Sequence, residues 1–285
     1  MPAWDTVAIV GVGLIGGSIG LALRERKLAR QVIGIGRRRE SLEQALSRGC
    51  ITQISTSVPE GVKQAQLVVV CTPVELIPRH VAEAAAAAPA GCLITDAGST
   101  KAQIVAGAEA LLATRFPSGL PFVGSHPLAG SEKNGADAAA ADLFVDRIVV
   151  VTPTKSSSSA AVAAIESFWQ SLGARVMRMS PAEHDAALAR TSHLPHLVAS
   201  ALAAATPDDL LPLTAAGWQD TTRIAAGDAE LWRQIFLANR ACTLKALADF
   251  ETVLARLRSA LEAADGPLLA ELLTEGKRRR DAMGS

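Results

Sequence analysis

Three short segments of the chain carry side chains that could do chemistry together. GSHPLAGSE places His126 between a serine and a proline, SHLPH holds His193 and His196, and QDTTRIA holds Arg223. A neutral imidazole, with an ordinary pKa of about 6.5, accepts protons readily near neutral pH. A guanidinium keeps its charge and grips a carboxylate through two parallel hydrogen bonds. These side chains suit general-base catalysis on an anionic substrate, provided that the fold brings them to one cleft.

The alternative for each histidine is a structural role. His126 follows a short apolar run and is either a solvated loop residue or a base that faces a cleft. Pro195 would interrupt a helix and expose the imidazoles on either side of it, which is costly in a purely structural helix. A histidine taken singly is more often a hydrogen-bonded core or surface residue, and we interpret His80 and His184 in that way.

The balance of charges limits the classes of partner. Lysine and arginine together number 28, as do aspartate and glutamate, so no net field draws the protein to nucleic acid or to an anionic membrane. An anionic substrate must therefore be met by local charge. The four cysteines form no CxxC pair, which favours reduced thiols in a cytoplasmic protein without a metal site. No apolar stretch reaches the length of a membrane span.

Alternating strand and helix patterns predict the fold of the first part of the chain. Short apolar runs separated by helical patterns predict a parallel sheet with helices on both faces. From Pro181 onward the strand-like runs stop, and leucine and alanine recur at helical spacing. We therefore expect an α/β protein with a Rossmann-type doubly wound sheet in residues 1–180 and an all-helical domain in residues 181–285. The predicted strands cover residues 7–10, 32–35, 67–71, 92–95, 121–123, 148–151 and 175–178.

The glycine pattern GVGLIGG, directly after the first predicted strand, is typical of dinucleotide binding. Gly11 permits a tight turn, Gly13 lets the backbone approach a pyrophosphate, and Gly16 lets the following helix pack close to the sheet. Leu14 and Ile15 lie between these glycines, where we expect them to contact the cofactor. The strand before the pattern and the helix after it make this prediction more specific than the glycines alone.

The end of the second predicted strand favours NADP over NAD. An NAD site usually places an acidic residue there for the ribose 2′-hydroxyl, but this chain has Gly36 followed by Arg37 and Arg38. Either arginine could pair with a 2′-phosphate; a solvated basic run is the alternative, and it leaves NAD open as the cofactor. Thr72 and Pro73 follow another strand at the ligand-binding edge of the sheet, so we expect them to contact the cofactor.

The order of the motifs resembles one enzyme family. DAGSTK, GSHPLAGSE, SHLPH and QDTTRIA follow the glycine pattern as they do in prephenate dehydrogenases, a family that includes arogenate and dual-substrate cyclohexadienyl dehydrogenases. The match spans Val7 to about Leu257. It implies a Rossmann-type domain, a helical domain that forms a homodimer, and an active site between them. The implied reaction is oxidative decarboxylation of prephenate to 4-hydroxyphenylpyruvate in tyrosine biosynthesis, with hydride transfer to NAD(P).

The resemblance implies a role for each matching residue. His126 is the catalytic histidine that accepts the proton of the ring C4 hydroxyl, and Ser99, in DAGSTK, hydrogen-bonds the same hydroxyl near the nicotinamide. His196 lies in the substrate pocket, and Arg223 binds a substrate carboxylate. The other residues assigned to substrate binding are Ser125 beside His126, Glu132 and Asp220, which hold the arginine in a polar network, and Trp232, for which a core position is an equal alternative.

Three other functions fit part of the pattern. Arogenate dehydrogenase performs the same chemistry on a substrate with an ammonium in place of the keto group; the second imidazole of SHLPH favours prephenate, because an additional potential cation suits a keto acid better. A β-hydroxyacid dehydrogenase would need a catalytic lysine in a glycine-rich context, which Lys245 lacks. A non-catalytic dinucleotide-binding protein would not require Ser99, His126 and Arg223 together.

Overall fold

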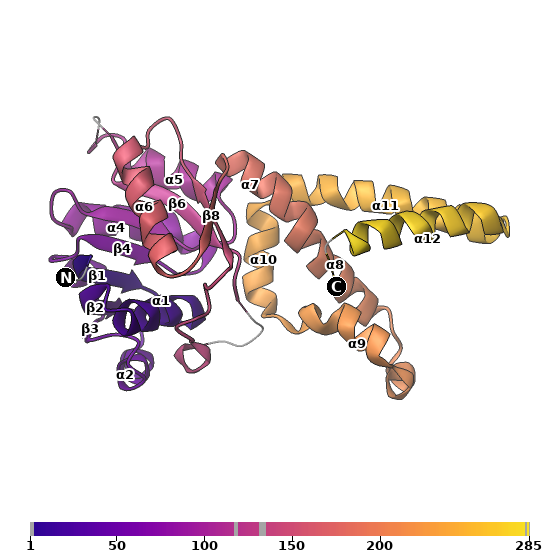
Figure 1. Cartoon of the computed structure of the whole chain (residues 1–285), viewed down its shortest axis with the longest axis horizontal. Coiled ribbons are helices and arrows are strands. Elements are labelled where there is room, and N and C mark those ends of the chain that lie inside the picture. The colour runs from indigo at the N-terminus through magenta and orange to yellow at the C-terminus, as the bar shows by residue number, and fades with distance from the viewer. Residues whose placement is uncertain (1–2, 117–118, 131–134, 283, 285) are drawn as a thin grey trace. The chain divides into compact units, whose positions relative to one another are not determined.

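The computed structural model of the chain describes residues 3–116, 119–130, 135–282 and 284. The chain divides into two compact units, residues 1–239 and residues 240–285 (Figure 1). The described part of the first unit contains an eight-stranded sheet with helices on both sides. The described part of the second unit consists of helix.

The strand order of the sheet is β3-β2-β1-β4-β5-β6-β7-β8. Neighbouring strands from β3 to β6 run parallel, β7 runs antiparallel to β6, and β8 runs parallel to β7. The order reverses between β1 and β4, which is the place where doubly wound sheets bind dinucleotides. The strands are β1 Trp4–Val10, β2 Ala29–Ile35, β3 Gln53–Ser55, β4 Leu67–Val70, β5 Leu93–Asp96, β6 Phe122–Pro127, β7 Ile148–Thr152 and β8 Arg175–Arg178.

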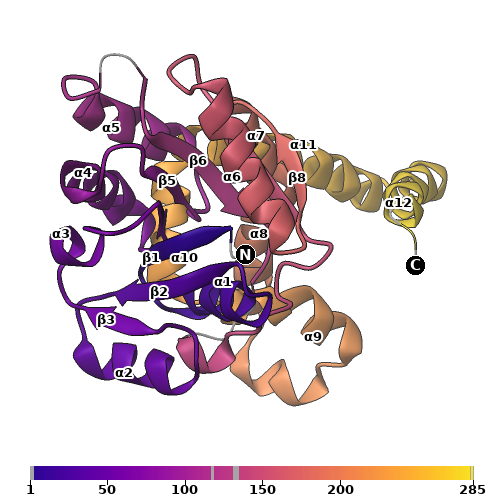
Figure 2. The same cartoon turned by 60° about the vertical axis from the view of Figure 1, so that its left-hand side comes forward.

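Helices lie on both faces of this sheet (Figure 2). Two hydrophobic clusters fill the space between the helices and the two faces. Val7 and Ile9 of β1 belong to one cluster, with side chains of α1, α2 and α6; Ala8 and Val10 belong to the other, with side chains of α3, α4 and α5. Both faces of the strands are therefore buried, which explains their continuous apolar sequence. These helices are α1 Leu14–Glu25, α2 Arg39–Ser47, α3 Val58–Gly61, α4 Ile77–Ala87, α5 Ala102–Leu112 and α6 Ser159–Ser171, and the short 3₁₀ turns are η1 Val74–Leu76 and η2 Ala136–Ala138.

The structure confirms the predicted α/β class and differs from the predicted sheet in two places. The edge strand β3 has three residues, too few to produce an apolar run in the sequence. The predicted parallel sheet is confirmed from β3 to β6, but between β6 and β7 the pairing is antiparallel, with Gly124–Pro127 opposite Val149–Thr152. This pairing extends β6 beyond residue 123, so His126 lies in a strand and not in the loop that follows it.

The segment after the last strand folds into helices that belong to the first unit. They are α7 Pro181–Leu188, a π-helical turn η3 Ala189–His193, α8 Leu194–Ala204, η4 Asp208–Leu213, α9 Ala216–Thr222, η5 Arg223–Ala226 and α10 Ala229–Ala238. Pro195 lacks an amide hydrogen and its ring clashes with the carbonyl four residues earlier, so the wider π turn precedes it in place of a break. Ile235 of α10 is buried in the second cluster of the sheet. A domain boundary at residue 180 stays a prediction.

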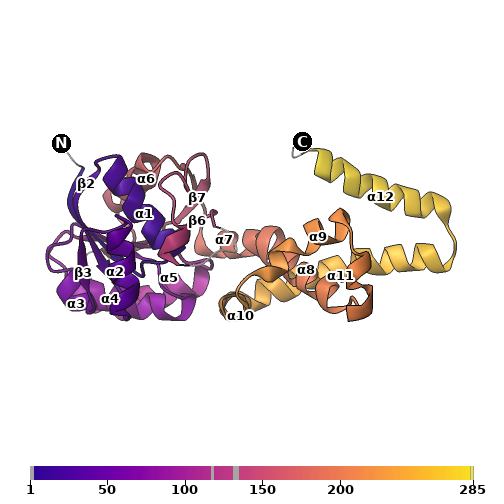
Figure 3. The same cartoon turned by 90° about the horizontal axis from the view of Figure 1, so that it is seen from below.

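The second unit is a pair of helices, α11 Arg240–Glu262 and α12 Gly266–Asp281, which contact each other as a hairpin (Figure 3). Ala264 has a φ of 51° in the turn between them, and the Asp265 carboxylate accepts a hydrogen bond from the Leu268 amide at the start of α12. Within the described ranges of the whole chain, no helix is both long and apolar enough to cross a membrane.

Candidate active site

The glycine pattern forms a turn with open space above it. Gly11 has a φ of 94°, and a Cβ there would lie 2.7 Å from the carbonyl oxygen of Cys71. A Cβ on Gly16 would lie 2.1 Å from the carbonyl oxygen of Gly11, so close packing requires both glycines. A Cβ on Gly13 would meet no heavy atom within 4 Å, and no side chain caps the helix α1 that begins after it. The uncapped start of α1 thus lies beside open space at Gly13, as a binding site for the pyrophosphate of a dinucleotide requires.

Cationic side chains lie where the adenosine ribose of a dinucleotide would bind. Arg37 and Arg38 follow β2 and are exposed, whereas Arg39 pairs with Glu43 at 2.9 Å. Among the described residues, no hydrogen bond or ion pair involves the guanidinium group of Arg37 or of Arg38. These two guanidinium groups are therefore available to an anionic ligand.

The segment after β4 lies on the other side of β1 from the segment that carries Arg37 and Arg38. Thr72 and Pro73 lie between β4 and η1. The hydroxyl of Thr72 lies 3.0 Å from Nδ1 of His80 on α4. Burial lowers the pKa of His80, Glu83 opposes this effect, and Arg79 and Arg37 add to it. His80 thus contacts Thr72, one of the residues predicted to bind the cofactor.

His126 is the first member of a chain of three hydrogen-bonded side chains. Its Nδ1 lies 2.8 Å from Nε2 of His184, and Nδ1 of His184 lies 2.8 Å from Oδ1 of Asp185. The carboxylate of Asp185 also accepts hydrogen bonds from the backbone amides of Lys101, at 2.7 Å, and Ala102, at 2.9 Å. Elements far apart in sequence therefore meet here, since β6 supplies His126, α7 supplies the other two side chains, and the start of α5 supplies the amides.

The hydrogen bonds of Asp185 determine which nitrogens carry protons. A carboxylate only accepts, so the proton between Asp185 and His184 belongs to Nδ1 of His184. Neutral His184 then accepts at Nε2, and the proton shared with His126 belongs to Nδ1 of His126. This assignment leaves Nε2 of neutral His126 as an unprotonated acceptor. The chain of hydrogen bonds thereby selects the tautomer that a general base requires.

The surroundings keep both imidazoles neutral. Burial holds the pKa of His126 well below its usual range, and His184, Lys101 and His193 lower it further. Burial also lowers the pKa of His184, and Lys101 adds to that effect, although Asp185 opposes it. Burial alone would raise the pKa of Asp185, but hydrogen bonds from His184 and the two backbone amides lower it below its ordinary value. The arrangement is a charged carboxylate that supports two neutral rings.

Ser125 lies in the core below this chain. Its side chain is fully buried, its hydroxyl donates to the carbonyl oxygen of Asp96 at 2.5 Å, and it accepts from the indole of Trp169 at 2.9 Å. The hydroxyl of Thr95 lies 2.8 Å away. The hydroxyl of Ser125 therefore already has partners within the protein, and a contact between Ser125 and substrate stays a prediction.

Ser99 lies at the carboxyl end of β5. It is half-buried in the segment between β5 and α5, and β5 neighbours the strand that carries His126. The carboxyl ends of β1, β4, β5 and β6 share one edge of the sheet because these strands run parallel. The glycine turn, Thr72, Ser99 and His126 therefore lie along the same edge.

His196 contacts a group of aromatic side chains on α10. Its ring is stacked on Trp232 with centroids 3.6 Å apart, and Phe236 lies 6.1 Å away. A Cβ on Gly227 would lie 3.2 Å from Cε1 of His196, so the backbone passes close to the ring. Nδ1 of His196 is buried and, in the described part of the chain, has no hydrogen-bond partner. Trp232 also packs against the second hydrophobic cluster, so it has both a core contact and a contact with His196.

His193 has a structural environment. It is buried, and its Nδ1 lies 3.2 Å from the carboxamide nitrogen of Asn239, which also donates to the carbonyl oxygen of Asp185 at 2.7 Å. Burial lowers its pKa to about 4, against the opposing effect of Asp185. His193 is therefore neutral at physiological pH. The preference for prephenate over arogenate that the second imidazole of SHLPH suggests stays a prediction.

Arg223 and Asp220 are both exposed. Arg223 begins the turn η5, which packs against α8, the helix of His196. Among the described residues no hydrogen bond or ion pair involves the Arg223 guanidinium. Glu132, predicted to hold this arginine together with Asp220, lies outside the described residues. The predicted polar network and the predicted meeting of His126 with Arg223 stay predictions.

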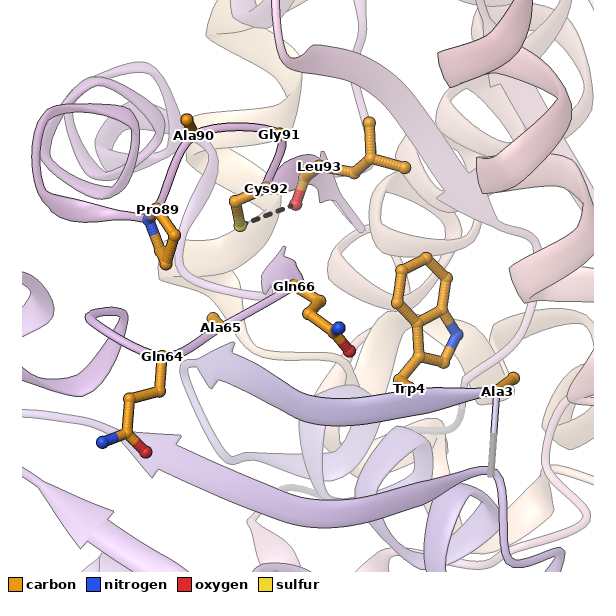
Figure 4. Close-up of a pocket in the computed structure, with 10 residues that line it drawn as sticks. All are labelled: Ala3, Trp4, Gln64, Ala65, Gln66, Pro89, Ala90, Gly91, Cys92 and Leu93. Atoms are coloured by element: carbon orange, nitrogen blue, oxygen red, sulfur yellow. Dashed lines mark hydrogen bonds between the residues drawn. The ribbon is translucent and has the colours of Figure 1, made fainter. Parts of the chain in front are cut away.

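Two surface hollows lie away from these residues. One, of about 350 Å³, is at the amino ends of β1 and β5, opposite to the glycine turn, and is lined by Trp4, Gln66 and Cys92 among others (Figure 4). The other, of about 720 Å³, lies between α5 and the segment before α6. Neither contains a predicted site residue. In the described part of the chain, no cluster of histidine, cysteine or acidic residues could hold a metal ion.

These features define a class of protein: an NAD(P)-dependent dehydrogenase with a Rossmann-type nucleotide-binding fold. The family model described as the nucleotide-binding domain of prephenate dehydrogenase matches residues 19–178, and the model of its dimerization domain matches residues 180–275. The chain belongs to the prephenate dehydrogenase family.

Relatives of known name agree with this family. The chain is 35% identical to a prephenate dehydrogenase of Bacillus subtilis, with 98% of this chain and 76% of that protein covered. It is 32% identical to a cyclohexadienyl dehydrogenase of Zymomonas mobilis, with 99% and 97% covered.

Two solved structures have a similar fold over nearly the whole length. Prephenate dehydrogenase from Aquifex aeolicus, in complex with hydroxyphenyl propionate and NAD+, has a TM-score of 0.89 and 31% identity, with 98% of each chain covered. Arogenate dehydrogenase from Synechocystis has a TM-score of 0.81 and 30% identity, with 98% of this chain and 99% of that chain covered.

Proposed function

We propose that the chain catalyses the oxidative decarboxylation of prephenate to 4-hydroxyphenylpyruvate, with hydride transfer to NADP or NAD, in tyrosine biosynthesis. The observation that supports this proposal best is the hydrogen-bonded chain of His126, His184 and Asp185, which leaves Nε2 of a neutral imidazole as the acceptor. The reaction requires a base at the hydroxyl of ring C4, because hydride leaves the carbon that bears this hydroxyl. The names of the relatives provide the substrate class.

In the proposed mechanism, Nε2 of His126 takes the proton of the C4 hydroxyl while the carbon–oxygen bond becomes a carbonyl. The nicotinamide, when bound, accepts the hydride from C4. The ring carboxylate then leaves as carbon dioxide, and its electron pair makes the ring aromatic with a phenolate oxygen at C4. His126 returns the proton to that oxygen, so no net proton is released. Aromatisation makes the sequence downhill, and positioning is the main task of the protein.

The remaining residues bind and orient. Ser99 hydrogen-bonds the C4 hydroxyl, Arg223 binds one substrate carboxylate, and His196, held against Trp232, lines the pocket. Glu132 and Asp220 hold the arginine. We assign Ser125 a positioning role, since its hydroxyl joins the strand of His126 to Asp96 and Trp169 within the core.

Gly11, Gly13 and Gly16, with Leu14 and Ile15, hold the pyrophosphate end of the cofactor. The predicted preference for NADP rests on Arg37 and Arg38, whose guanidinium groups have no hydrogen bond or ion pair among the described residues and could pair with a 2′-phosphate. Thr72 and Pro73 contact the cofactor beside them.

We also propose that residues 181–285 form the domain through which two copies associate as a homodimer. The family model for this part is described as a dimerization domain. Large apolar side chains are exposed on the helices of the second unit, as expected of an interface: Leu244, Val253, Leu254, Leu261 and Leu273. A cytoplasmic location agrees with four unpaired cysteines.

Arogenate is the second candidate substrate, supported by the likeness to the arogenate dehydrogenase structure. Assays of the two substrates side by side, each with NADP and with NAD, decide between them. Substitution separates the roles: we expect His126→Ala to lower kcat with little change in KM, and Arg223→Ala to raise KM. Interchange of these two phenotypes would reject the assignment, and cofactor binding without reduction by either substrate would reject the proposed function.

A further inference from the structure

Lys101 is a fully buried lysine that the proposed chemistry does not use. Its ammonium group pairs with the carboxylate of Asp96, whose side chain is also completely buried. It donates a second hydrogen bond, of 2.8 Å, to the carbonyl oxygen of Ser125, the residue directly before His126. Burial of an ammonium group is unfavourable unless it is well paired, so a lysine at this place needs an explanation.

The backbone of the same residue contacts the other end of the histidine chain. The Lys101 amide donates to Oδ1 of Asp185, the oxygen that accepts the proton of His184. One residue at the start of α5 therefore fixes the strand of His126 through its side chain and the carboxylate of Asp185 through its main chain. α5 contacts both β6 and α7, the two elements that carry the chain (Figure 1).

We propose that Lys101 is a positioning residue of the catalytic base, which holds the strand of His126 and the carboxylate of Asp185 in register and places a buried, paired cation near the two imidazoles. This inference rests on the proposed function for its kinetic consequence but not for its geometry. The hydrogen bonds give Lys101 the position, and its charge gives it the electrostatic effect.

The charged and titratable groups around the two rings come from every packed element. His126 faces His184 on α7, Lys101 before α5, and His193 on the π turn. His184 faces Asp185, Lys101 and Asp96. Lys101 lowers the pKa of both rings, and the two carboxylates raise that of His184. Removing the cation should therefore make protonation of the rings easier.

The charge of Lys101 and its structural role are separated by two substitutions. In Lys101→Met, which removes the cation, the acid limb of kcat/KM against pH moves upward. In Lys101→Arg, which keeps a cation at this place, the limb stays where it is in the wild type. If Lys101 served only to support the fold, the two variants would move the limb alike or leave it in place, and either result overturns the proposal.

Thr95→Val is the matched control. It removes a buried hydroxyl that also lies next to Ser125, without a change of charge. We expect it to lower the melting temperature and leave the acid limb in place. An equal shift in this variant would assign the effect of Lys101→Met to loosened packing and overturn the proposal.

Histidine-selective NMR of the wild type and of Lys101→Met provides a test that needs no substrate. The rings of His126 and His184 should titrate below the ordinary pKa of histidine in the wild type, and at a higher pH in Lys101→Met. An unchanged titration of both rings in Lys101→Met overturns the role of Lys101 even if turnover is observed. Absence of turnover with prephenate and with arogenate would reject the proposed function, while the NMR result still decides the inference.

Discussion

The substitution Asp185→Asn tests the hydrogen-bonded chain without a change of size. The carboxylate accepts three hydrogen bonds, at 2.8 Å from His184, 2.7 Å from the Lys101 amide and 2.9 Å from the Ala102 amide. A carboxamide has one oxygen and one donor group, so it cannot accept from all three partners. If its nitrogen faces His184, that ring must accept at Nδ1 and donate at Nε2, and His126 then carries its proton on Nε2.

The expected loss follows from the role of a general base. A base in the wrong tautomer cannot accept the substrate proton, and a positioned general base contributes about 10²–10⁴-fold to the rate. We therefore expect kcat of Asp185→Asn to fall by roughly 10²–10⁴-fold, equivalent to about 3–5 kcal/mol of activation free energy. KM should change little, because Asp185 is two hydrogen bonds away from His126 and does not contact the substrate.

The assay is the appearance of reduced nicotinamide over a range of substrate concentrations, with thermal unfolding measured in parallel. Asp5→Asn is the matched control, because it removes an exposed carboxylate that pairs with Arg30 at 3.0 Å on the surface. This control should keep full kcat. If Asp185→Asn stays folded and keeps kcat within about tenfold of wild type, the tautomer argument is refuted.

Three further results are expected. Gly13→Ala should weaken cofactor binding and change the free energy of unfolding by less than about 1 kcal/mol. Gly11→Ala should strongly destabilise the fold, because Gly11 has a φ of 94° and its Cβ would meet a carbonyl oxygen at 2.7 Å. Titration calorimetry measures the loss of cofactor binding, and melting curves measure the loss of stability. Folding lowers the pKa of His193 from 6.5 to about 4, so between these pH values the unfolded chain binds a proton that the folded chain does not. The free energy of unfolding should therefore fall by about 3 kcal/mol for this residue as the pH drops through this window. Chemical denaturation from pH 7 to pH 4 measures this change, and a flat profile contradicts the burial of a neutral ring. Replacing Arg37 and Arg38 by alanine should raise the Kd for NADP at least tenfold, on the order expected for a lost charged pair, and leave the Kd for NAD nearly unchanged. An equal effect on both cofactors would show that the arginines do not contact a 2′-phosphate.

The cofactor turn could be predicted from the sequence because its requirements are local. Gly11 and Gly16 are needed for contacts with residues that are close in the chain or in the adjoining strand, and the strand before them and the helix after them are visible as patterns. The reversal of strand order beside this turn follows from the same alternation. The direction of β7 could not be predicted, because a run of valines is equally compatible with either direction.

The hydrogen bond from His126 to His184 could not be predicted from the spacing of residues in the sequence. His184 is 58 residues from His126, and we interpreted it as structural because nothing in the sequence pairs the two rings. Their contact depends on how α7 packs beside the sheet. Lys101 was visible in DAGSTK, but its burial beneath β6 is a tertiary property. The two histidines of SHLPH also have different roles, one bonded to Asn239 and the other stacked on Trp232, which their sequence does not distinguish.

The central claim is tested most directly by a reaction of the purified chain with prephenate and NADP. Reduced cofactor, carbon dioxide and 4-hydroxyphenylpyruvate are all quantified, and the His126→Ala variant is measured in parallel. We predict that the wild type forms the three products in equal amounts and that the variant binds NADP equally well but forms them far more slowly. Wild-type kcat in His126→Ala would contradict the account, as would a wild-type protein that binds NADP and reduces it with neither prephenate nor arogenate.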